Sequence, residues 1–303
     1  MNQAEGLLLK DRILRYIAAN GHVRIMLAET TEACEEARRL HAASPVAAAA
    51  MGRTLSAALM LASELKGRGS ITATVSGDGP VGRICAVARP NGDVKAYCSN
   101  PSADLPVRAD GKLDVSGAVG SRGRLAVVKD LGMREPWVGQ VDLVSGELGE
   151  DFAMYLAKSQ QQPSIVSLGV LVSPEYRVIS AGGIIVQPLP GCTDEIITEL
   201  EGIAPSLADI SRKLRSSGAE GLIRSAFAGM GPELAGSMPV RLKCDCSQDR
   251  IERALMAMGS AELEDMIAKD GGAEVCCHFC NTKYTFTGDE LEGLRNAAIQ
   301  RQT

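Results

Sequence analysis

Five of the nine cysteines lie in the last 60 residues, and four of these form two close pairs. One residue separates Cys244 from Cys246, two residues separate Cys277 from Cys280, and 30 residues lie between the pairs. Two close thiol pairs joined by one compact spacer have the spacing of metal ligands. Four thiolates favour tetrahedral Zn²⁺ and leave no coordination position open for a substrate. The spacing therefore predicts a structural or regulatory zinc site rather than a Lewis-acid catalyst.

Two other interpretations of these cysteines remain open. Cys277 and Cys280 alone have the spacing of a thioredoxin-like redox motif, but that motif belongs near a βαβ pattern and not beside a second thiol pair. A zinc finger suggests a nucleic-acid-binding protein, yet residues 240–303 hold eight Lys and Arg against eleven Asp and Glu, a net charge of −3. Zinc with four thiolates adds about −2, so this segment repels phosphates. A purely structural zinc module is the simplest alternative.

A zinc-stabilised enzyme whose chemistry lies in residues 1–190 is a further alternative, but the other motifs do not support it. Gly77–Gly82 fits a GxGxxG string, but a strand is expected after it where a dinucleotide site needs a helix, and Asp78-Gly79 is a hairpin signal. The chain has three histidines and no GxSxG or Walker-type phosphate loop. We therefore expect no catalytic residues. The isolated cysteines are expected to pack as small apolar side chains; these are Cys34, Cys85, Cys98 and Cys192.

Residues 1–190 must supply most of the core, and their pattern predicts an α+β domain. Ser44-Pro45 starts a long apolar helix that runs to Lys66. Short alternating runs separated by Gly, Asp and Asn turns predict a mixed, largely antiparallel sheet. The expected strands and one further helix follow. The strands are His22–Glu29, Ser70–Ser76, Arg83–Arg89, Val94–Cys98, Leu125–Lys129, Val138–Val144, Ile165–Val172 and Tyr176–Val186, and the helix is Glu150–Lys158.

Residues 191–238 predict a linker of short amphipathic helices. Apolar residues recur at steps of three and four, which puts them on one helical face. They are Ile196, Leu200, Ile203, Leu207, Ile210 and Leu214. Gly202, Pro205 and Gly218 interrupt the pattern. Helices this short are marginal unless their apolar face is docked on another element.

Residues 239–303 predict a small domain organised by its metal. Ile251 to Met258 has helical periodicity, Ser260 is placed to cap a second helix, and Thr287 and Glu290 have the spacing of a capping box. A unit of about 65 residues with few large side chains is marginal without a cross-link or metal.

Composition limits the class of protein. The chain has 303 residues, 45% hydrophobic and 23% charged, with a net charge of −5, which is ordinary for a globular protein. An acidic chain with 3% aromatic residues does not have the composition of a general nucleic-acid binder. No run approaches the ~18 apolar residues of a membrane span, and Leu7–Leu9 is too short for a signal peptide. We expect a cytoplasmic protein with reduced thiols.

Beyond the cysteines, several motifs spread over nearly the whole chain resemble those of one family, the redox-regulated thirty-three-kilodalton heat-shock chaperones. These motifs are Ser76-Gly77-Asp78-Gly79-Pro80, Tyr155 with Ser159–Pro163, Ala181-Gly182-Gly183, Gln187–Gly191, Cys277-x-x-Cys280-Asn281 and Tyr284-x-Phe286. The resemblance implies an ATP-independent holdase that responds to oxidative stress and is inactive while reduced.

The same resemblance assigns roles to single residues. It implies zinc ligation by Cys244, Cys246, Cys277 and Cys280, followed on oxidation by Cys244–Cys246 and Cys277–Cys280 disulfides and zinc release. The linker then unfolds, exposed apolar surface captures unfolding client proteins, and the active form dimerises. The sequence departs from the family at Cys276, which is expected to compete with Cys277, and His278 is a second candidate intruder.

Overall fold

The computed structural model describes residues 11–300, with side chains to residue 299, and the chain divides into two compact units. The first unit is Met1–Lys243 and the second is Cys244–Thr303. The apolar run Leu7–Leu9 lies outside the described residues. Segment 191–238 belongs to the first unit. The division of that unit into a core domain and a linker therefore remains a prediction.

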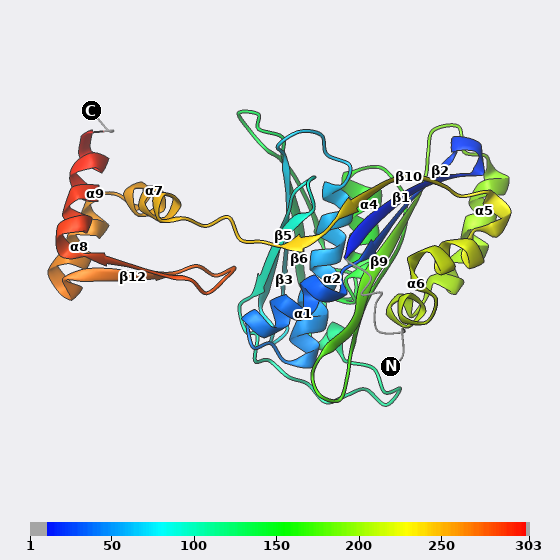
Figure 1. The fold of residues 1–303 in the computed structure, drawn as a ribbon, viewed down its shortest axis with the longest axis horizontal. Helices are drawn as coiled ribbons and strands as arrows, with labels where there is room; N and C mark the ends of the chain where they lie inside the picture. The colour runs from blue at the N-terminus through cyan, green and yellow to red at the C-terminus, as the bar shows by residue number, and fades with distance from the viewer. Residues whose placement is uncertain (1–10, 301–303) are drawn as a thin grey trace, which may run out of the picture. The chain divides into compact units, whose positions relative to one another are not determined.

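Two antiparallel-rich sheets form the frame of the first unit (Figure 1). The five-stranded sheet has the order β10-β1-β2-β9-β8, and the six-stranded sheet has the order β11-β5-β4-β3-β6-β7. All neighbouring strands are antiparallel except β11, which is parallel to β5. The strands are β1 Arg12–Ala18, β2 Val23–Glu29, β3 Ser70–Gly77, β4 Arg83–Ala88, β5 Asp93–Cys98, β6 Gly123–Asp130, β7 Trp137–Asp142, β8 Ile165–Val172, β9 Val178–Pro188, β10 Glu233–Pro239 and β11 Arg241–Leu242.

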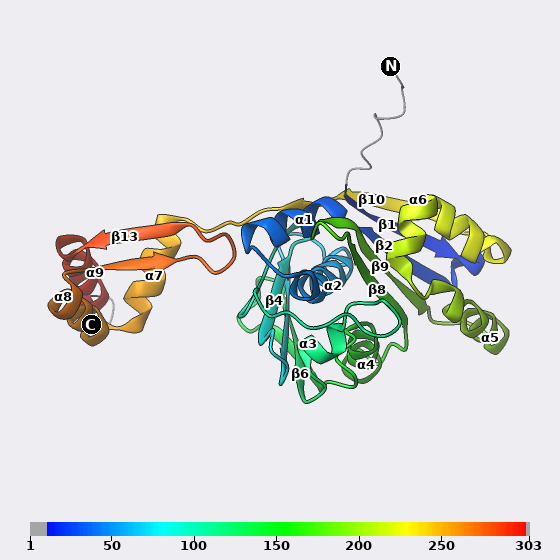
Figure 2. The ribbon, with the colours of Figure 1, turned by 90° about the horizontal axis from the view of Figure 1, so that it is seen from below.

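Helix α2 (Pro45–Ala62) lies between the two sheets and contacts strands of both (Figure 2). Ser44 caps it by accepting a 3.2 Å hydrogen bond from the amide of Ala47, with Pro45 in the first turn, as the sequence predicts. Its length and composition are those of a membrane span, but 89% of it is buried within the fold. That burial identifies α2 as the central core helix.

Smaller helices cover the ends of this frame. They are α1 Thr31–Leu40, α3 Val115–Val119 and α4 Gly149–Ser159, with the short 3₁₀ turn η1 Ala19–Gly21. Residues alternate along the five-stranded sheet, so that Ile13 and Met26 face α2 while Leu14 and Ile25 face the opposite side.

The predicted linker helices pack on that opposite side. They are α5 Asp194–Ile203, η2 Ala204–Leu207 and α6 Ile210–Ala226, followed by η3 Ala228–Met230. Leu200, Leu207, Ile210 and Leu214 are buried against the sheet, as the periodicity predicts. Helix α6 is kinked at Gly218, whose φ of +66° is costly for other residues. Docking on the sheet supplies the burial that these short helices lack alone.

Polar contacts also attach the linker helices to the rest of the first unit. The buried carboxylate of Glu29 accepts a 3.0 Å hydrogen bond from the amide of Ala219, just after the kink in α6. Lys112 forms an exposed 2.6 Å ion pair with Asp209. Further contacts are Arg12 with Glu220, the Ser167 hydroxyl with the Leu207 carbonyl, and the Ser180 hydroxyl with the Ser211 carbonyl.

The second unit has helices α7 Gln248–Met258, α8 Ser260–Asp270 and α9 Gly288–Gln300 around the hairpin of β12 Gly272–Cys276 and β13 Lys283–Thr287. Its core holds four buried apolar side chains, Leu255, Leu263, Phe286 and Leu291. The capping box of α9 is confirmed, because Thr287 and Glu290 exchange backbone-to-side-chain hydrogen bonds of 2.8 and 3.3 Å.

The α+β fold class is confirmed, and the predicted strands and long helices are present within a few residues of their bounds. Residues Gly77–Gly82 connect the antiparallel strands β3 and β4, which excludes the dinucleotide-loop geometry. Ser260 is not a cap: Gly259 precedes α8 without a side-chain hydrogen bond, and Ser260 lies inside the helix. The sequence interpretation missed β1, α1, α3, β10 and β12.

Candidate metal centre

The first cysteine pair lies in the loop that enters α7. Ser247 caps that helix by accepting a 3.3 Å hydrogen bond from the amide of Arg250. Arg250 in turn donates a 3.0 Å hydrogen bond to the carbonyl of Asp245 and forms an ion pair with its carboxylate. The residue between Cys244 and Cys246 is therefore held by the first turn of the helix, which fixes both thiols.

The second pair lies in the tight turn that joins β12 to β13. The carbonyl of Cys277 accepts hydrogen bonds from the amides of Cys280 and Asn281, at 3.3 and 2.8 Å, and the amide of Cys277 donates to the Thr282 carbonyl at 2.9 Å. Asn281 has a φ of +56°, in the left-handed region that Asn tolerates better than most residues. This turn directs both thiols of the pair to one side.

The structure brings the four sulfurs of Cys244, Cys246, Cys277 and Cys280 together, all within 4.8 Å of one another. Cys244 Sγ lies 3.7 Å from Cys277 Sγ, and Cys246 Sγ lies 3.3 Å from Cys280 Sγ. Tetrahedral zinc with bonds of about 2.3 Å requires sulfurs about 3.8 Å apart. The sulfur cluster therefore matches the size of a four-thiolate metal site, and the separations are those of unbonded thiols.

Neighbouring groups set the charge state of this cluster. Burial raises the pKa of Cys244 and of Cys277. Burial opposes ionisation at Cys280 too, but hydrogen bonds with Thr282 and with the neighbouring thiols lower its pKa to about 7. The Tyr284 hydroxyl donates a 3.1 Å hydrogen bond to Cys246 Sγ, and this bond raises the pKa of Tyr284 to about 12. Tyr284 therefore supports the cluster, whereas sequence reasoning placed it only in a family motif and assigned it no role at the metal site.

Comparison with known proteins gives one consistent result. The family described as Hsp33 protein matches residues 11–287. The chain belongs to the Hsp33 family. It is 46% identical over 286 residues to the 33 kDa chaperonin of Bacillus subtilis, covering 94% of this chain and 98% of that protein. It is 43% identical over 285 residues to the 33 kDa chaperonin of Staphylococcus aureus, covering 94% and 97%.

A solved structure agrees with these relatives. The crystal structure of the 33 kDa chaperonin of Thermotoga maritima matches with a TM-score of 0.87 at 35% identity, covering 96% of this chain and 99% of that chain. The suspected family is therefore confirmed, and with it chaperone function as the class of activity.

In this Hsp33-family chain, the two residues expected to compete for the metal, Cys276 and His278, lie outside the sulfur cluster. Cys276 is exposed on β12, while the next residue, Cys277, is buried. This follows from the alternation of side chains along a strand, which points neighbours to opposite faces. His278 is also exposed. The cluster includes Cys277 and neither neighbour.

The isolated cysteines largely follow their expected role. Cys34, Cys85 and Cys98 are buried, and burial raises the pKa of Cys34 to about 12 and of Cys98 to about 11. These thiols are poor nucleophiles for oxidants because the thiolate is disfavoured. Cys192 differs from the expectation, since it is only half-buried.

Proposed function

We propose that this chain is an ATP-independent holdase chaperone that oxidation activates, with Zn²⁺ bound by Cys244, Cys246, Cys277 and Cys280 in the inactive form. The observation that carries the proposal is the set of four sulfurs, from two segments about 30 residues apart, with separations that suit tetrahedral zinc. No open coordination position remains for a substrate, which supports a regulatory role and no enzymatic one.

The proposed switch is thiol chemistry. Hydrogen peroxide would oxidise the two thiolates of a pair to one disulfide and, taking up two protons from solvent, be reduced to two molecules of water. Loss of these two ligands would release Zn²⁺. We propose Cys244–Cys246 and Cys277–Cys280 as the disulfides. A Cys-x-Cys disulfide closes a small ring and is strained, so reductants reverse it readily. The switch then returns to the zinc-bound form when thiols are restored.

Zinc loss removes the free energy that keeps the second unit folded. Zinc binding contributes about 10–16 kcal/mol in small zinc domains, and that binding energy is folding energy. We propose that disorder spreads from Cys244 back along the chain through β11, which is only two residues long, to the linker. The bonds from Glu29 to Ala219 and from Lys112 to Asp209 resist this release.

Release of the linker exposes apolar surface on both sides of the contact. The linker segment exposes apolar residues such as Leu207, Ile210 and Leu222. The sheet exposes Leu14 and Ile25. Exposed apolar area of this kind binds the apolar segments of unfolding proteins. We propose that these segments are the clients, that the oxidised form is a homodimer, and that the protein acts in the cytoplasm on proteins rather than on membranes.

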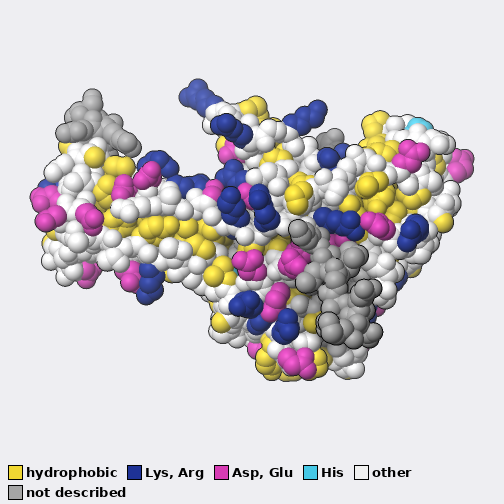
Figure 3. Space-filling view, viewed as in Figure 1, with side chains coloured by type: hydrophobic (Ala, Val, Ile, Leu, Met, Phe, Trp, Pro, Cys, Tyr) yellow, Lys and Arg dark blue, Asp and Glu magenta, His cyan; other side chains and the backbone are white. Residues whose placement is uncertain are grey.

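Nucleic acid is a poor partner for the second unit. In Figure 3, acidic and basic side chains are interspersed on the visible face of that unit, and residues 244–303 hold six Lys and Arg against eleven Asp and Glu, a net charge of −5. A continuous basic surface is the usual footprint of nucleic-acid binding.

Light scattering of a heat-aggregating client enzyme tests the proposal. We expect suppression of aggregation by peroxide-treated protein, none by reduced zinc-loaded protein, and loss of suppression after dithiothreitol. Equal suppression in all three states would falsify oxidative activation and leave a structural zinc module. Cys276→Ser is the matched control, since this cysteine is exposed and outside the cluster.

Trypsin digestion tests the disulfide pairing. Cleavage after Lys243 and Arg250 isolates Cys244 and Cys246 in one peptide, and cleavage after Lys269 and Lys283 isolates the other pair in a second peptide. The proposed disulfides leave the two peptides unlinked, each lighter by two hydrogens. A linked pair of peptides would show bonds between the pairs instead. The Cys276→Ser variant removes the ambiguity within the second peptide.

A further inference from the structure

Tyr284 connects the hairpin of the second unit to the first cysteine pair. It lies on β13 opposite Val275 of β12, and its hydroxyl donates a 3.1 Å hydrogen bond to Cys246 Sγ. Its half-buried ring packs against the apolar core of the unit. Packing of the ring therefore holds the hydroxyl beside a sulfur that comes from a segment 38 residues away.

A second hydroxyl lies beside the other cysteine pair. Thr282 Oγ1 is 3.2 Å from Cys280 Sγ. A metal-bound sulfur carries no proton, so in the metal-loaded site both hydroxyls must donate their hydrogen bonds to sulfur. The two sulfurs concerned, Cys246 and Cys280, lie 3.3 Å apart and belong to different pairs. Each pair of thiols thus has a sulfur that a side-chain hydroxyl contacts.

An oxidant can reach both sulfurs that have a hydroxyl partner. Cys246 and Cys280 are half-buried, whereas Cys277 is buried. Thiolates react with peroxides through an electron pair on sulfur. A donated hydrogen bond stabilises the negative charge of that sulfur and makes its electron pair less available. The hydroxyl should therefore slow attack at a sulfur that burial leaves accessible.

We propose that Tyr284 is a positioning residue that makes Cys246 less reactive and so sets the rate at which oxidants form the Cys244–Cys246 disulfide. The inference rests on the proposed oxidative switch and deepens it, because it identifies a side chain that controls when the switch responds. Zinc, when bound, keeps the four sulfurs as thiolates. Tyr284 determines how readily one of those thiolates donates electrons to an oxidant.

The step that Tyr284 opposes is the first oxidation of sulfur. An electron pair of the Cys246 thiolate attacks hydrogen peroxide, the O–O bond breaks, and the sulfur becomes a sulfenic acid while the departing hydroxide takes a proton from solvent. The Cys244 thiolate then attacks that sulfur, and the second hydroxide leaves and is protonated to water. Two electrons pass from the two sulfurs to one peroxide. The hydrogen bond from Tyr284 weakens as Cys246 loses its negative charge.

Tyr284→Phe tests the proposal on the reduced, zinc-loaded full chain, because phenylalanine keeps the ring and removes only the hydroxyl. The protein is exposed briefly to hydrogen peroxide, free thiols are blocked, and trypsin separates the two cysteine pairs into two peptides. We expect the Cys244–Cys246 disulfide to form about fivefold faster than in the unchanged chain, a modest effect for a charge-assisted hydrogen bond because sulfur is a weak acceptor. The initial rate of the Cys277–Cys280 disulfide should not change.

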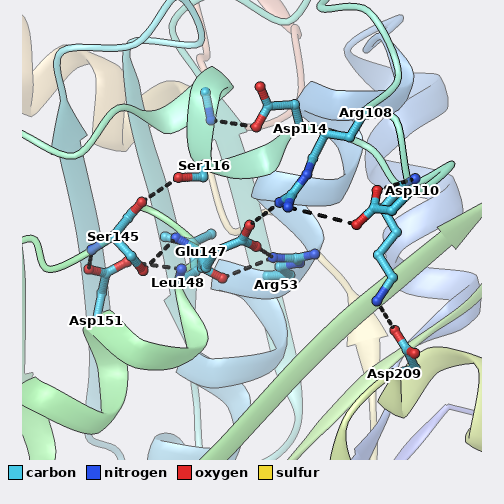
Figure 4. A network of polar contacts seen from close by, with 12 residues as sticks. Arg53, Arg108, Asp110, Asp114, Ser116, Ser145, Glu147, Leu148, Asp151 and Asp209 are labelled. Atoms are coloured by element: carbon cyan, nitrogen blue, oxygen red, sulfur yellow. Dashed lines mark hydrogen bonds and ion pairs between the residues drawn. The ribbon is translucent and has the colours of Figure 1, made fainter.

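Thr282→Val is the reciprocal variant. It removes the hydroxyl beside Cys280 and keeps the backbone carbonyl that accepts a hydrogen bond from the amide of Cys277. It should speed formation of the disulfide in that pair and leave the initial rate of the other pair unchanged. Ser116→Ala is the matched control, since it removes a hydroxyl hydrogen bond to the Ser145 carbonyl in the first unit (Figure 4). Both initial rates should then stay as in the unchanged chain.

A spectroscopic measurement distinguishes this role from a purely structural one. With Co²⁺ in place of Zn²⁺, the absorption band from sulfur-to-metal charge transfer should move to longer wavelength in Tyr284→Phe, because the electrons of a sulfur without the hydrogen bond are more easily removed. An unchanged rate, an unchanged absorption band, or equal acceleration of both disulfides would overturn the inference. Suppression of client aggregation by the oxidised chain, measured separately, tests the proposed function, and its absence would leave the effect of Tyr284 on disulfide formation measurable.

Discussion

The two units of this chain reach a folded state by different physical means. The first has two large apolar clusters, one on each face of its five-stranded sheet, with α2 at the centre. Among the described residues, the apolar cluster of the second unit has four buried side chains in a unit of about 60 residues. Burial on that scale is marginal for independent folding. The first unit therefore depends on its core, whereas under the proposed function the second unit depends on a bound metal ion that oxidation removes.

Metal removal should produce the largest difference in folding between the two units. With a chelator, or with Cys246→Ser, we expect the second unit to lose its helices and β12–β13 hairpin, because about 10–16 kcal/mol of zinc-binding free energy is lost. The first unit should keep its β-sheet signal and a cooperative melt. Hydrogen exchange resolved by peptide measures both units in one sample.

The control for that experiment is Cys276→Ser, which changes an exposed thiol outside the sulfur cluster. It should leave zinc content at one ion per chain and the exchange pattern unchanged. A second unit that stays ordered without metal would remove the physical basis for the comparison.

Acid should release the metal while the first unit stays folded. Since burial raises the pKa of Cys244 and of Cys277, both thiols are protonated in the metal-free unit at neutral pH and lose protons when zinc binds. Lowering the pH therefore weakens zinc binding, by at least about a hundredfold per pH unit from these two thiols. Cys280, with a pKa of about 7, adds a third proton below that pH.

Competition with a chromogenic chelator between about pH 8 and about pH 6 measures this slope. An affinity that does not change with pH would mean that the ligands are already thiolates before the metal binds.

A cavity in the core of the first unit should destabilise that unit and leave the second unit unaffected. Phe152 is fully buried on α4, and Phe152→Ala should lower the free energy of unfolding of the first unit by about 3–5 kcal/mol. Zinc affinity should be unchanged within error. Urea unfolding followed by circular dichroism, with zinc binding measured in parallel, checks both. A change in zinc affinity would show that the two units are energetically coupled in the reduced state.

The smallest expected effect concerns the attachment of the linker. Glu29→Ala leaves the buried amide of Ala219 without its acceptor, which costs about 1–3 kcal/mol. We expect faster hydrogen exchange in α6 and activation at a lower oxidant concentration, with the second unit unaffected. Glu29→Gln is the control, because its amide oxygen still accepts from Ala219. Identical exchange in both variants would assign the effect to the lost Arg12 ion pair instead.

Many structural features of this chain can be predicted from the spacing of residues that are close in sequence. The cysteine pairs, the Ser44-Pro45 helix start, the Thr287–Glu290 capping box and the hairpin at Gly77–Gly82 each involve neighbours in sequence, and each appears where it was expected. The apolar face of the linker helices was also evident from its period, because a helix repeats every 3.6 residues whatever it packs against.

Long-range contacts decided the rest. Strand β10 exists because it pairs with β1, more than 200 residues earlier in the chain, and α1 starts where the Asp11 carboxylate accepts hydrogen bonds from the amides of Glu32 and Ala33. Neither partner is visible in a local window. The sequence by itself determined which residues can bind a metal and which faces are apolar. Only the tertiary structure decided what covers those faces, since burial depends on elements that are distant along the chain.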